Sequence, residues 1–454
     1  MRKIYILAVL FAAVLFACKP AAQTEPSQDP VPVSSDPSVE PSDEPSQEPS
    51  VEPSEEPSSE PVVEIVIDNQ KLSEYLISKF DLDGNGKLTS DEAELITEIT
   101  LWTWGSEGQM KGMNLNSLAG VEQLVNLRKI DARKNLLVTV DLEECPSLKE
   151  LNVSYNRISK VASLPEWLEK LDISHNSLTS LSLSGLPNLK WLDCGENKLS
   201  ALVPTFCESL EYLGAYNNKL SALSLPASVK EVDCYTNSIT SLEVPSGLVR
   251  LNCTNNKLTA LDVSSCSGLE ALYCSLNQIS TLTLTGLSSL RTLACDNNAL
   301  KTLSVSGCSS LRFLECWQNS IESLDLSGLS SLEVAGLSMN SLGTLKVSGC
   351  SSLRALYAFG NQLASIDLSS CAALENLYLH SNILQSIDLS ANTRLRGLRL
   401  ADNSLTSLDL SNQTSLKMMY CTGNPGLSSV VISSSTNPSS LYWHKDSSVT
   451  YTNK

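Results

Sequence analysis

Histidines and aromatic residues are scarce in this sequence. Among its 454 residues there are only three histidines, His175, His380 and His444, and aromatic residues make up 5% of the chain. The sequence contains no P-loop, no nucleophile elbow and no zinc-ligand spacing. The first two histidines are too far apart in the chain to act as a catalytic pair, so we expect no enzymatic activity.

Runs of basic residues are also absent. Lys and Arg total 32 against 50 Asp and Glu, which gives a formal net charge of −18 at pH 7. Nucleic acids and anionic lipid surfaces attract clustered positive charge. The composition therefore argues against both as partners.

Only one long apolar run occurs, and it lies at the N-terminus. Arg2 and Lys3 precede it, and it is too short to be a preferred membrane-spanning helix, so residues 1–17 are predicted to be a signal peptide. Its last residues, LFAC, resemble the lipobox of bacterial lipoproteins, which implies that Cys18 is acylated and anchors the mature chain. The alternative is an ordinary signal peptide with an incidental cysteine. A lipid on Cys18 would be the only membrane attachment.

The next segment, residues 18–61, is rich in Pro, Ser and Glu, with units such as EPSDEPSQEPS, and contains no aromatic residue. It has too little apolar surface to offset the entropy of ordering. Its prolines and like charges keep such a chain extended. We predict a disordered tether between the lipid and the rest of the protein.

A twelve-residue acidic loop, DLDGNGKLTSDE, follows between two short predicted helices in residues 62–104. It matches the EF-hand pattern, in which oxygen ligands recur at fixed spacing and a glycine makes the central turn. The predicted Ca²⁺ ligands are Asp81, Asp83, Asn85, Lys87 through its carbonyl, Thr89 and Glu92. The alternative is an EF-like loop that has lost its metal. Because only one such loop is present, we expect one structural ion in an N-terminal cap.

Residues 105–424 are predicted to be repeats. The template Leu-x-x-Leu-x-(Cys/Leu/Ala)-x-x-Asn-x-(Leu/Ile) recurs mostly every 21 residues, and two units are shortened to 19. This period and pattern predict a leucine-rich-repeat solenoid, with parallel strands on a concave side and short extended or 3₁₀ segments on the convex side. The repeats are marked by the asparagines Asn135, Asn156, Asn176, Asn197, Asn218, Asn237, Asn256, Asn277, Asn298, Asn319, Asn340, Asn361, Asn382, Asn403 and Asn424.

Cysteines recur three residues before seven of these asparagines. They are Cys194, Cys234, Cys253, Cys274, Cys295, Cys316 and Cys421. In this respect the repeats resemble those of bacterial internalins, in particular the kind with a cysteine ladder, whose helical cap is also EF-hand-like. The sequence departs from that family in its lipobox and in lacking a C-terminal wall-sorting signal. The resemblance implies a lipid-anchored relative with an adhesive or recognition role.

A second set of cysteines lies eleven residues before an asparagine. It comprises Cys145, Cys207, Cys266, Cys308, Cys350 and Cys371. Secretion permits disulfides. Parallel neighbours are about 4.8 Å apart, however, whereas disulfides prefer Cβ atoms about 3.8 Å apart. We expect mostly free, buried thiols that pack in the core, with a metal or redox array as the alternative.

The concave face of such a solenoid would carry the residues six, four, two and one before each asparagine. Twelve of the 24 Phe, Trp and Tyr residues fall there, and they are the predicted partner-binding residues: Tyr155, Trp191, Tyr212, Tyr216, Tyr235, Tyr273, Phe313, Trp317, Tyr357, Phe359, Tyr378 and Tyr420. His175 and His380 occupy the same positions. Exposed aromatic residues are frequent interface anchors. The alternative is that strand propensity alone favours them.

Acidic residues are interspersed on this predicted face, with Arg250 and Arg399 as isolated positive charges. The acidic residues are Asp172, Asp193, Glu196, Glu231, Asp233, Asp296 and Glu315. A partner with a basic or hydroxyl-rich surface would suit them. We expect an extracellular protein first and a glycan, captured as a nutrient, second.

The last residues, 425–454, depart from the template and are predicted to form strands that cap the solenoid, with Tyr442 and Trp443 in the cap core. The sequence as a whole predicts a monomeric lipoprotein of the cell envelope, anchored in the outer membrane and exposed at the cell surface. It would bind a macromolecule through the concave face. A purely structural envelope protein is the remaining alternative.

Overall fold

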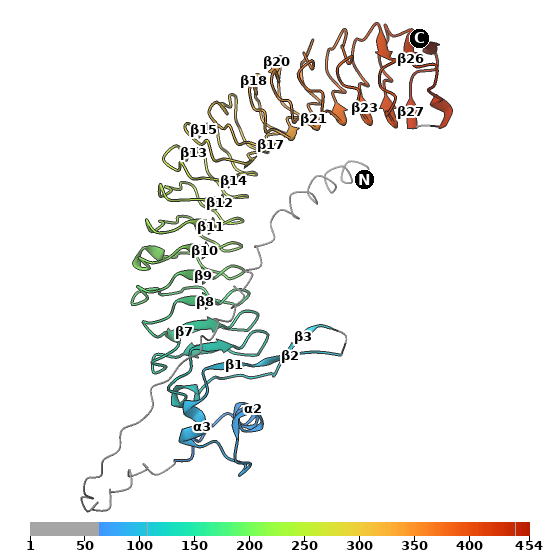
Figure 1. Cartoon of the computed structure of the whole chain (residues 1–454). Coiled ribbons are helices and arrows are strands. Elements are labelled where there is room, and N and C mark those ends of the chain that lie inside the picture. Colours follow the sequence, from blue (N-terminus) through green and yellow to red (C-terminus); the bar gives the residue numbers. More distant parts are fainter. Residues whose placement is uncertain (1–62, 107, 441) are drawn as a thin grey trace, which may run out of the picture. The chain divides into compact units, whose positions relative to one another are not determined.

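The computed structural model describes residues 63–106, 108–440 and 442–454, which fall within one compact unit, Pro61–Lys454 (Figure 1). The predicted signal peptide, Cys18 and the predicted tether lie outside the described residues. Among the helices of the described part, none is long and apolar enough to cross a membrane.

A parallel sheet of 17 strands runs through the unit, with one strand from each turn of the chain. The predicted leucine-rich-repeat solenoid is therefore confirmed. In spatial order the strands are β1 (Glu98–Thr100), β4 (Lys129–Asp131), β6 (Glu150–Asn152), β8 (Lys170–Asp172), β9 (Trp191–Asp193), β10 (Tyr212–Gly214), β11 (Glu231–Asp233), β12 (Arg250–Asn252), β14 (Ala271–Tyr273), β16 (Thr292–Ala294), β17 (Phe313–Glu315), β19 (Val334–Gly336), β21 (Ala355–Tyr357), β22 (Asn376–Tyr378), β23 (Gly397–Arg399), β25 (Met418–Tyr420) and β27 (Tyr442–His444).

Each strand of this sheet except the last, β27, buries its middle residue and turns the residues on either side of it outward. In β9, for example, Leu192 is fully buried between Trp191 and Asp193. Equivalent residues pair in register from strand to strand, as Leu192 does with Leu213 of β10. A slip of one residue would move every buried side chain to the solvent side, so the repeating pattern fixes the register.

The repeat asparagines connect successive coils by hydrogen bonds. The side-chain amide of Asn298 donates to the carbonyl oxygens of Cys274 at 3.0 Å, in the preceding coil, and of Cys295 at 3.0 Å and Asp296 at 3.2 Å, in its own coil. Its Oδ1 accepts from the backbone N–H of Ile279 at 2.9 Å. The same pattern recurs along the solenoid. These bonds satisfy backbone groups that the three-residue strands leave unpaired.

The residue before each repeat asparagine adopts a left-handed backbone conformation. Its φ is +56° at Tyr155, +53° at His175 and +54° even at the β-branched Thr236. This conformation is costly for a non-glycine residue. The asparagine hydrogen bonds hold it in place, and the turn directs these side chains toward the sheet side of the coil.

Short strands form the side of the coil opposite the large sheet, together with 3₁₀ turns, as predicted (Figure 1). The 3₁₀ turns are η2 (Val121–Gln123), η3 (Pro204–Phe206) and η4 (Pro438–Ser440). The strands form small parallel sheets, namely β5 (Thr139–Asp141) with β7 (Lys160–Ser163), β13 (Ala260–Asp262) with β15 (Thr281–Thr283), β18 (Ser323–Asp325) with β20 (Thr344–Lys346), and β24 (Leu408–Leu410) with β26 (Ser429–Ile432) and β28 (Thr450–Asn453).

All thirteen cysteines of the described residues are free and buried, as expected. The cysteines that lie three residues before an asparagine, such as Cys295, are fully buried in the core. In the second set, the Cys350 thiol lies 3.1 Å from the carbonyl oxygen of Leu326. Burial raises the pKa of Cys350 to about 11 and that of Cys371 to about 12, so these thiols stay protonated at neutral pH.

A small helical region precedes the sheet, with α2 (Gln70–Phe80) and α3 (Ser90–Glu94). Leu72 and Leu76 of α2 are fully buried in the core, which is consistent with a cap. Strand β1 pairs with β4, so the large sheet begins inside the range 62–104 that the sequence predicted for the cap. An antiparallel hairpin, β2 (Trp102–Trp104) with β3 (Met110–Gly112), was not predicted.

The C-terminal residues extend both sides of the solenoid with strands in parallel register. Strand β27 pairs with β25, and β28 pairs with β26. Trp443 stands opposite the buried Met419 and packs against the core, as predicted. The prediction for Tyr442 was wrong, because this residue is 77% exposed. It pairs with Met418, which occupies an outward position of β25.

Removing one repeat asparagine tests its contribution to stability. Asn403 donates to the carbonyl oxygens of Leu379 and Leu400 and accepts from the N–H of Leu384. Asn403→Ala leaves these buried groups unpaired, so we expect a loss of several kcal/mol in the free energy of unfolding, because each such group costs about 1–3 kcal/mol. Urea denaturation measures this loss. Asn412→Ala, at an exposed position of the same coil, should be nearly neutral; equal losses would contradict the proposed role.

Candidate functional site

The sheet face is defined here as the outward side chains at six, four, two and one residues before each repeat asparagine. All twelve predicted aromatic residues belong to it by position. Tyr155 is 48% exposed and Phe313 is 38% exposed, and nine others are partly exposed. Tyr273 differs from the prediction, because only 8% of its surface is exposed. The guanidinium carbon of Arg250 lies over its ring, 5.8 Å from the centroid, and helps to cover it.

Aromatic rings on the sheet face stack in pairs across neighbouring strands. Parallel in-register strands place equivalent residues about 4.8 Å apart, which is a suitable stacking distance. The stacked pairs, with their centroid distances, are Tyr155 with His175 (3.9 Å), Trp191 with Tyr212 (5.0 Å), Tyr216 with Tyr235 (4.9 Å), Phe359 with His380 (4.5 Å) and Tyr420 with His444 (4.5 Å). Tyr357 and Tyr378 meet edge to face at 5.0 Å.

The aromatic residues gather in two regions of the sheet face. The first aromatic cluster, in β6 to β11 and the turns that follow them, contains Tyr155, His175, Trp191, Tyr212, Tyr216 and Tyr235. The second aromatic cluster, in β17 to β25 and the turns that follow them, contains Phe313, Trp317, Tyr357, Phe359, Tyr378, His380 and Tyr420. The predicted partner-binding residues therefore do not form one continuous row, because the middle repeats separate the two clusters.

Positive charges on the sheet face lie against aromatic rings. Arg399 is 4.7 Å from the ring centroid of Tyr378 and 5.2 Å from that of Tyr420. Lys170 is 5.0 Å from that of Trp191. The sequence suggested that Arg399 was isolated, but its cation–π contacts depend on side chains from neighbouring coils.

Two carboxylates of the first aromatic cluster accept hydrogen bonds from tyrosines. The Tyr216 hydroxyl donates to Asp193 at 3.2 Å, and the Tyr212 hydroxyl donates to Asp233 at 3.4 Å. Gly214 lies between the two aspartates in the sheet, and its missing side chain leaves room for them. Burial raises the pKa of Asp193 to about 7 and raises that of Asp233 as well.

Two further carboxylates lie beside the second aromatic cluster. Asp296 accepts from the hydroxyl of Ser275 and, at 2.8 Å, from the side-chain amide of Asn297. Glu315 on β17 lies above Gly336 of β19. Burial raises the pKa of Glu315 to about 7, and nearby Asp296 adds to the effect.

The predicted metal ligands do converge within the loop of residues 81–92. Asp81, Asp83 and Glu92 each offer an oxygen atom, and these atoms lie within 4.8 Å of one another. Asp81 also accepts from the backbone N–H groups of Gly84 and Gly86, both of which have positive φ. Hydrogen bonds from the backbone N–H of Thr89 and then of Leu82 hold the pKa of Glu92 below its ordinary value.

The remaining predicted ligands occupy the same loop. Asn85 accepts from the backbone N–H of Lys87 at 2.8 Å, and the Thr89 hydroxyl donates to Glu92 at 2.9 Å. The Lys87 ammonium lies 2.7 Å from a carboxylate oxygen of Glu64, outside the loop. An all-oxygen donor set with a glycine at the turn fits a hard cation such as Ca²⁺.

An extended segment next to the loop supports its conformation. The backbone N–H of Ile65 donates to the carbonyl of Leu88 at 2.7 Å, and that of Ser90 donates to Val63 at 2.8 Å. Glu64 and Thr89 form an antiparallel bridge. The sequence did not predict this pairing, because residues 63–65 carry no motif of their own. This pairing supports the loop, which has no second loop of the same kind beside it in the described part of the chain.

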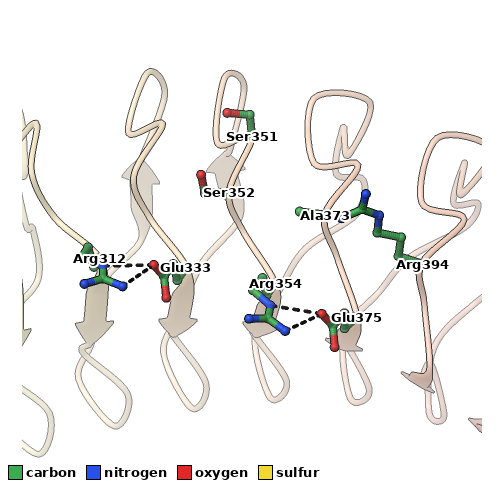
Figure 2. A pocket seen from close by; sticks show the side chains of 8 residues that line it. All are labelled: Arg312, Glu333, Ser351, Ser352, Arg354, Ala373, Glu375 and Arg394. Atoms are coloured by element: carbon green, nitrogen blue, oxygen red, sulfur yellow. Dashed lines mark hydrogen bonds and ion pairs between the residues drawn. The ribbon is translucent and has the colours of Figure 1, made fainter. Parts of the chain in front are cut away.

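A ladder of charged residues, not predicted from the sequence, runs along the edge where the strands begin. It lies seven residues before the repeat asparagines, and neighbouring coils often carry opposite charges (Figure 2). Lys149 and Lys190 both pair with Glu169, at 2.8 and 2.7 Å. Arg354 donates to Glu375 at 2.7 Å. The regular offset from the asparagine could have revealed it.

An open hollow of about 550 Å³ lies on this ladder, lined by residues that include Arg312, Glu333, Arg354, Glu375 and Arg394 (Figure 2). Arg312 donates to Glu333 at 2.6 Å. The charges are mostly engaged with each other; the arginine side chains are exposed, and the glutamate side chains are partly exposed. Exposed pairs of this kind contribute little to stability.

Comparison with known proteins supports the repeat architecture. Two family models, both described as leucine-rich repeat, match residues 167–189 and 144–161. No curated protein sequence matches the chain. The matches cover two short stretches, and the rest of the solenoid is recognised from its structure.

Several solved structures share the fold. The functional domain of InlJ from Listeria monocytogenes, described as including a cysteine ladder, is 22% identical over 81% of this chain and 75% of that chain, with a TM-score of 0.57. The internalin InlF from the same organism is 22% identical over 78% and 95%, with a TM-score of 0.53. The plant peptide hormone receptor RGFR1, in complex with RGF2, is 20% identical over 73% and 68%, with a TM-score of 0.54. The chain is thus a leucine-rich-repeat protein that resembles internalins in fold.

The raised carboxyl pKa values predict a pH dependence of stability. Folded Asp193 keeps its proton up to about pH 7, whereas the unfolded chain loses it near the ordinary value of 3.8. The folded state therefore binds more protons between these values, and stability falls as pH rises through this window. Asp193→Asn should remove this loss of stability. The free energy of unfolding should therefore rise by on the order of 2 kcal/mol at neutral or higher pH and hardly change in acid.

Urea denaturation of the wild type and Asp193→Asn at both ends of this window measures the difference. Asp262→Asn is the matched control, because hydrogen bonds from Ser264 lower the pKa of the exposed Asp262. That variant should bring no gain at neutral pH. If Asp193→Asn were equally stabilising in acid, the titration would not be the cause.

Proposed function

We propose that the protein is a cell-envelope lipoprotein that binds an extracellular macromolecule, most favourably a protein, through its sheet face. The observation that carries this proposal is the pair of aromatic clusters on that face. Exposed aromatic rings bury a large area on binding at a small cost in side-chain entropy. The leucine-rich-repeat fold generally serves as a non-enzymatic scaffold for such interactions.

Strand propensity and cross-strand bracing explain part of the aromatic content, since the rings stack on one another. They do not explain why Tyr155 and Phe313 remain 48% and 38% exposed. Nor do core requirements select these positions, because the buried middle residue of each strand and the residue two positions after it, such as Leu192 and Cys194, already fill the core. The exposed surface of the two clusters is therefore available to a partner.

The similar structures favour a protein over a glycan as the partner. The plant receptor of similar fold is described in complex with a peptide hormone. Two clusters spread over many repeats suit an extended protein surface better than a compact sugar. A glycan remains the second candidate, because Asp193 and Asp233 beside stacked rings could hydrogen-bond sugar hydroxyls.

Lipidation of Cys18 and export are part of the same proposal. The motif LFAC after a short apolar run supports them. A tether of residues 18–61 would hold the repeats away from the membrane. An outer-membrane anchor with surface exposure would place the sheet face where a partner can reach it.

One structural Ca²⁺ in the loop 81–92 completes the proposal. The converging oxygens of Asp81, Asp83 and Glu92 support it. The ion would neutralise these carboxylates and fix the position of α3, which begins inside the loop. It would thereby stabilise the first coil of the solenoid.

The test of partner binding uses residues 61–454, the compact unit, on arrays of extracellular proteins and glycans. A variant with Trp191→Ala, Phe313→Ala and Tyr357→Ala removes rings from both clusters. We expect its binding to the recognised protein to fall at least about a hundredfold, because aromatic anchors commonly contribute 2 kcal/mol or more each. Biolayer interferometry on the hits gives the dissociation constants.

A matched control carries Trp167→Ala and Phe206→Ala, which remove exposed rings away from the sheet face. These residues are 51% and 56% exposed. The control should bind like the wild type. Equal losses in both variants, or no hit for the wild type, would contradict recognition by the sheet face, and hits confined to glycans would select the second candidate.

Removal of calcium should lower the thermal stability of residues 61–454. At a calcium concentration about 100 times Kd, binding to the folded state alone adds roughly 2.7 kcal/mol. Melting curves with calcium and with chelator measure the shift in Tm. In Asp81→Asn combined with Glu92→Gln, calcium should no longer change Tm, and an unchanged wild-type melt in chelator would exclude a structural ion.

A further inference from the structure

A gap in the second aromatic cluster lies over strand β19. On the sheet face this coil carries Val334, Gly336 and Ser338, which are small or medium-sized, and in the following turn the exposed Met339, whose sulfur lies against Gly360 of the next coil. The neighbouring coils carry Trp317 on one side and Phe359 on the other, at the position that Ser338 occupies in its own coil. Two strand spacings separate these rings by roughly 10 Å. We call this part of the sheet face, where the coil of β19 lacks a ring between the coils of β17 and β21, the Gly336 trough.

The carboxyl group of Glu315 leans into the Gly336 trough. A Cβ atom added to Gly336 would lie only 1.9 Å from Glu315 Oε2, so this oxygen occupies the space that a side chain would fill. Among the described residues, Oε2 is buried and has no hydrogen-bond donor. A buried carboxylate oxygen without a donor is costly, and such groups usually have a function.

Other carboxylates on the sheet face are better satisfied. Asp296 accepts from Ser275 and Asn297, and Asp172 accepts from the hydroxyl of Ser174 at 2.7 Å. In the described sheet-face positions from β14 to β22 there is no Lys or Arg. The nearby Arg312 lies at the strand edge, and its guanidinium group donates two hydrogen bonds to Glu333. Glu315 therefore faces the trough without a cation of its own chain.

Ser338 supplies a second unpaired polar group in the same coil. It is 4% exposed, and its hydroxyl has no hydrogen-bond partner among the described residues. In the coils of β6 and β8 the equivalent serines donate to the side chain two residues earlier, Asn152 or Asp172. In this coil that residue is Gly336, which has no side chain. The hydroxyl is thus left without its usual partner, two residues along the chain from the glycine over which the Glu315 carboxyl group lies.

We propose that the Gly336 trough binds an organic ammonium group, supplied by a lysine side chain of the partner protein. The ammonium would donate to Glu315 Oε2 and Ser338 Oγ, the two atoms that lack partners. Trp317, Phe359 and Tyr357 would surround the methylene chain and face the cation.

The electrostatics of the trough agree with this ligand. Burial raises the pKa of Glu315 to about 7, and burial, followed by smaller effects of Tyr378 and Glu315, raises the pKa of Tyr357. A bound ammonium would favour the ionised carboxylate. Binding should therefore weaken when the pH falls below about 7, since the protonated acid no longer attracts the cation.

This inference rests on the proposed function, because it names the chemistry of the partner at the same face. Its test does not need the partner. The probe is N-acetyl-lysine N-methylamide, titrated into residues 61–454 at about pH 8, where Glu315 is ionised, and observed by ligand-detected NMR. N-acetyl-norleucine N-methylamide, which has a terminal methyl group instead of the ammonium, is the matched neutral probe.

We expect the lysine probe to bind at least about tenfold more tightly than the norleucine probe. Glu315→Gln, of nearly equal size, should abolish this preference. Gly336→Ala should weaken binding too, because the added Cβ would occupy the position of Glu315 Oε2. Glu231→Gln, at an exposed carboxylate of the same face, should bind like the wild type, and melting curves establish that each variant is folded.

Equal affinities for the two probes, no binding by the wild type, or an undiminished preference in folded Glu315→Gln would overturn the ammonium site. If the protein partner still needed the aromatic clusters, the proposed function would stand without it. If the lysine probe bound as expected but no macromolecule did, a free amine would become the ligand and the proposed function would fail.

Discussion

The hydrogen bonds of the repeat asparagines join each coil to the one before it. Each asparagine amide donates to carbonyl groups of two successive coils, and its oxygen accepts from a backbone N–H of the preceding coil, as at Asn298. Strands of three residues cannot satisfy their own flanking backbone groups. The left-handed residue before each asparagine is also held by these bonds. The direction of the side chain at that residue depends on this turn, whereas the strand residues are directed by the parallel pairing.

Exact stacking of equivalent positions gives the surface its chemistry. Side chains at one position form a row whose members are about 4.8 Å apart. Rings in such a row stack, as in Trp191 with Tyr212, and charges alternate, as in the edge ladder of Lys149, Glu169 and Lys190. A glycine in such a row leaves a gap between the side chains of the neighbouring coils. At Gly214 and at Gly336 the neighbouring carboxyl group moves into the vacated space and loses solvent.

The two candidate sites rely on different kinds of order. The loop 81–92 is local, because its ligands lie within twelve residues and its turn is set by glycine. Only its support, the pairing with residues 63–65, comes from outside the loop. The sheet face is non-local, since neighbouring rings such as Phe359 and His380 are 21 residues apart in sequence and 4.5 Å apart in space. Binding there would therefore depend on the integrity of several coils at once.

The sequence by itself determined the solenoid, the strand positions, the buried cysteines and the convergence of the Asp81, Asp83 and Glu92 carboxylates, because period and local spacing are written in the order of residues. It did not reveal that Tyr273 is covered by Arg250. Nor did it reveal the outward turn of Tyr442, the hairpin of β2 and β3, or the placement of Glu315 over Gly336. These features were decided by the tertiary structure, because burial and pairing between coils depend on the size of side chains in adjacent repeats.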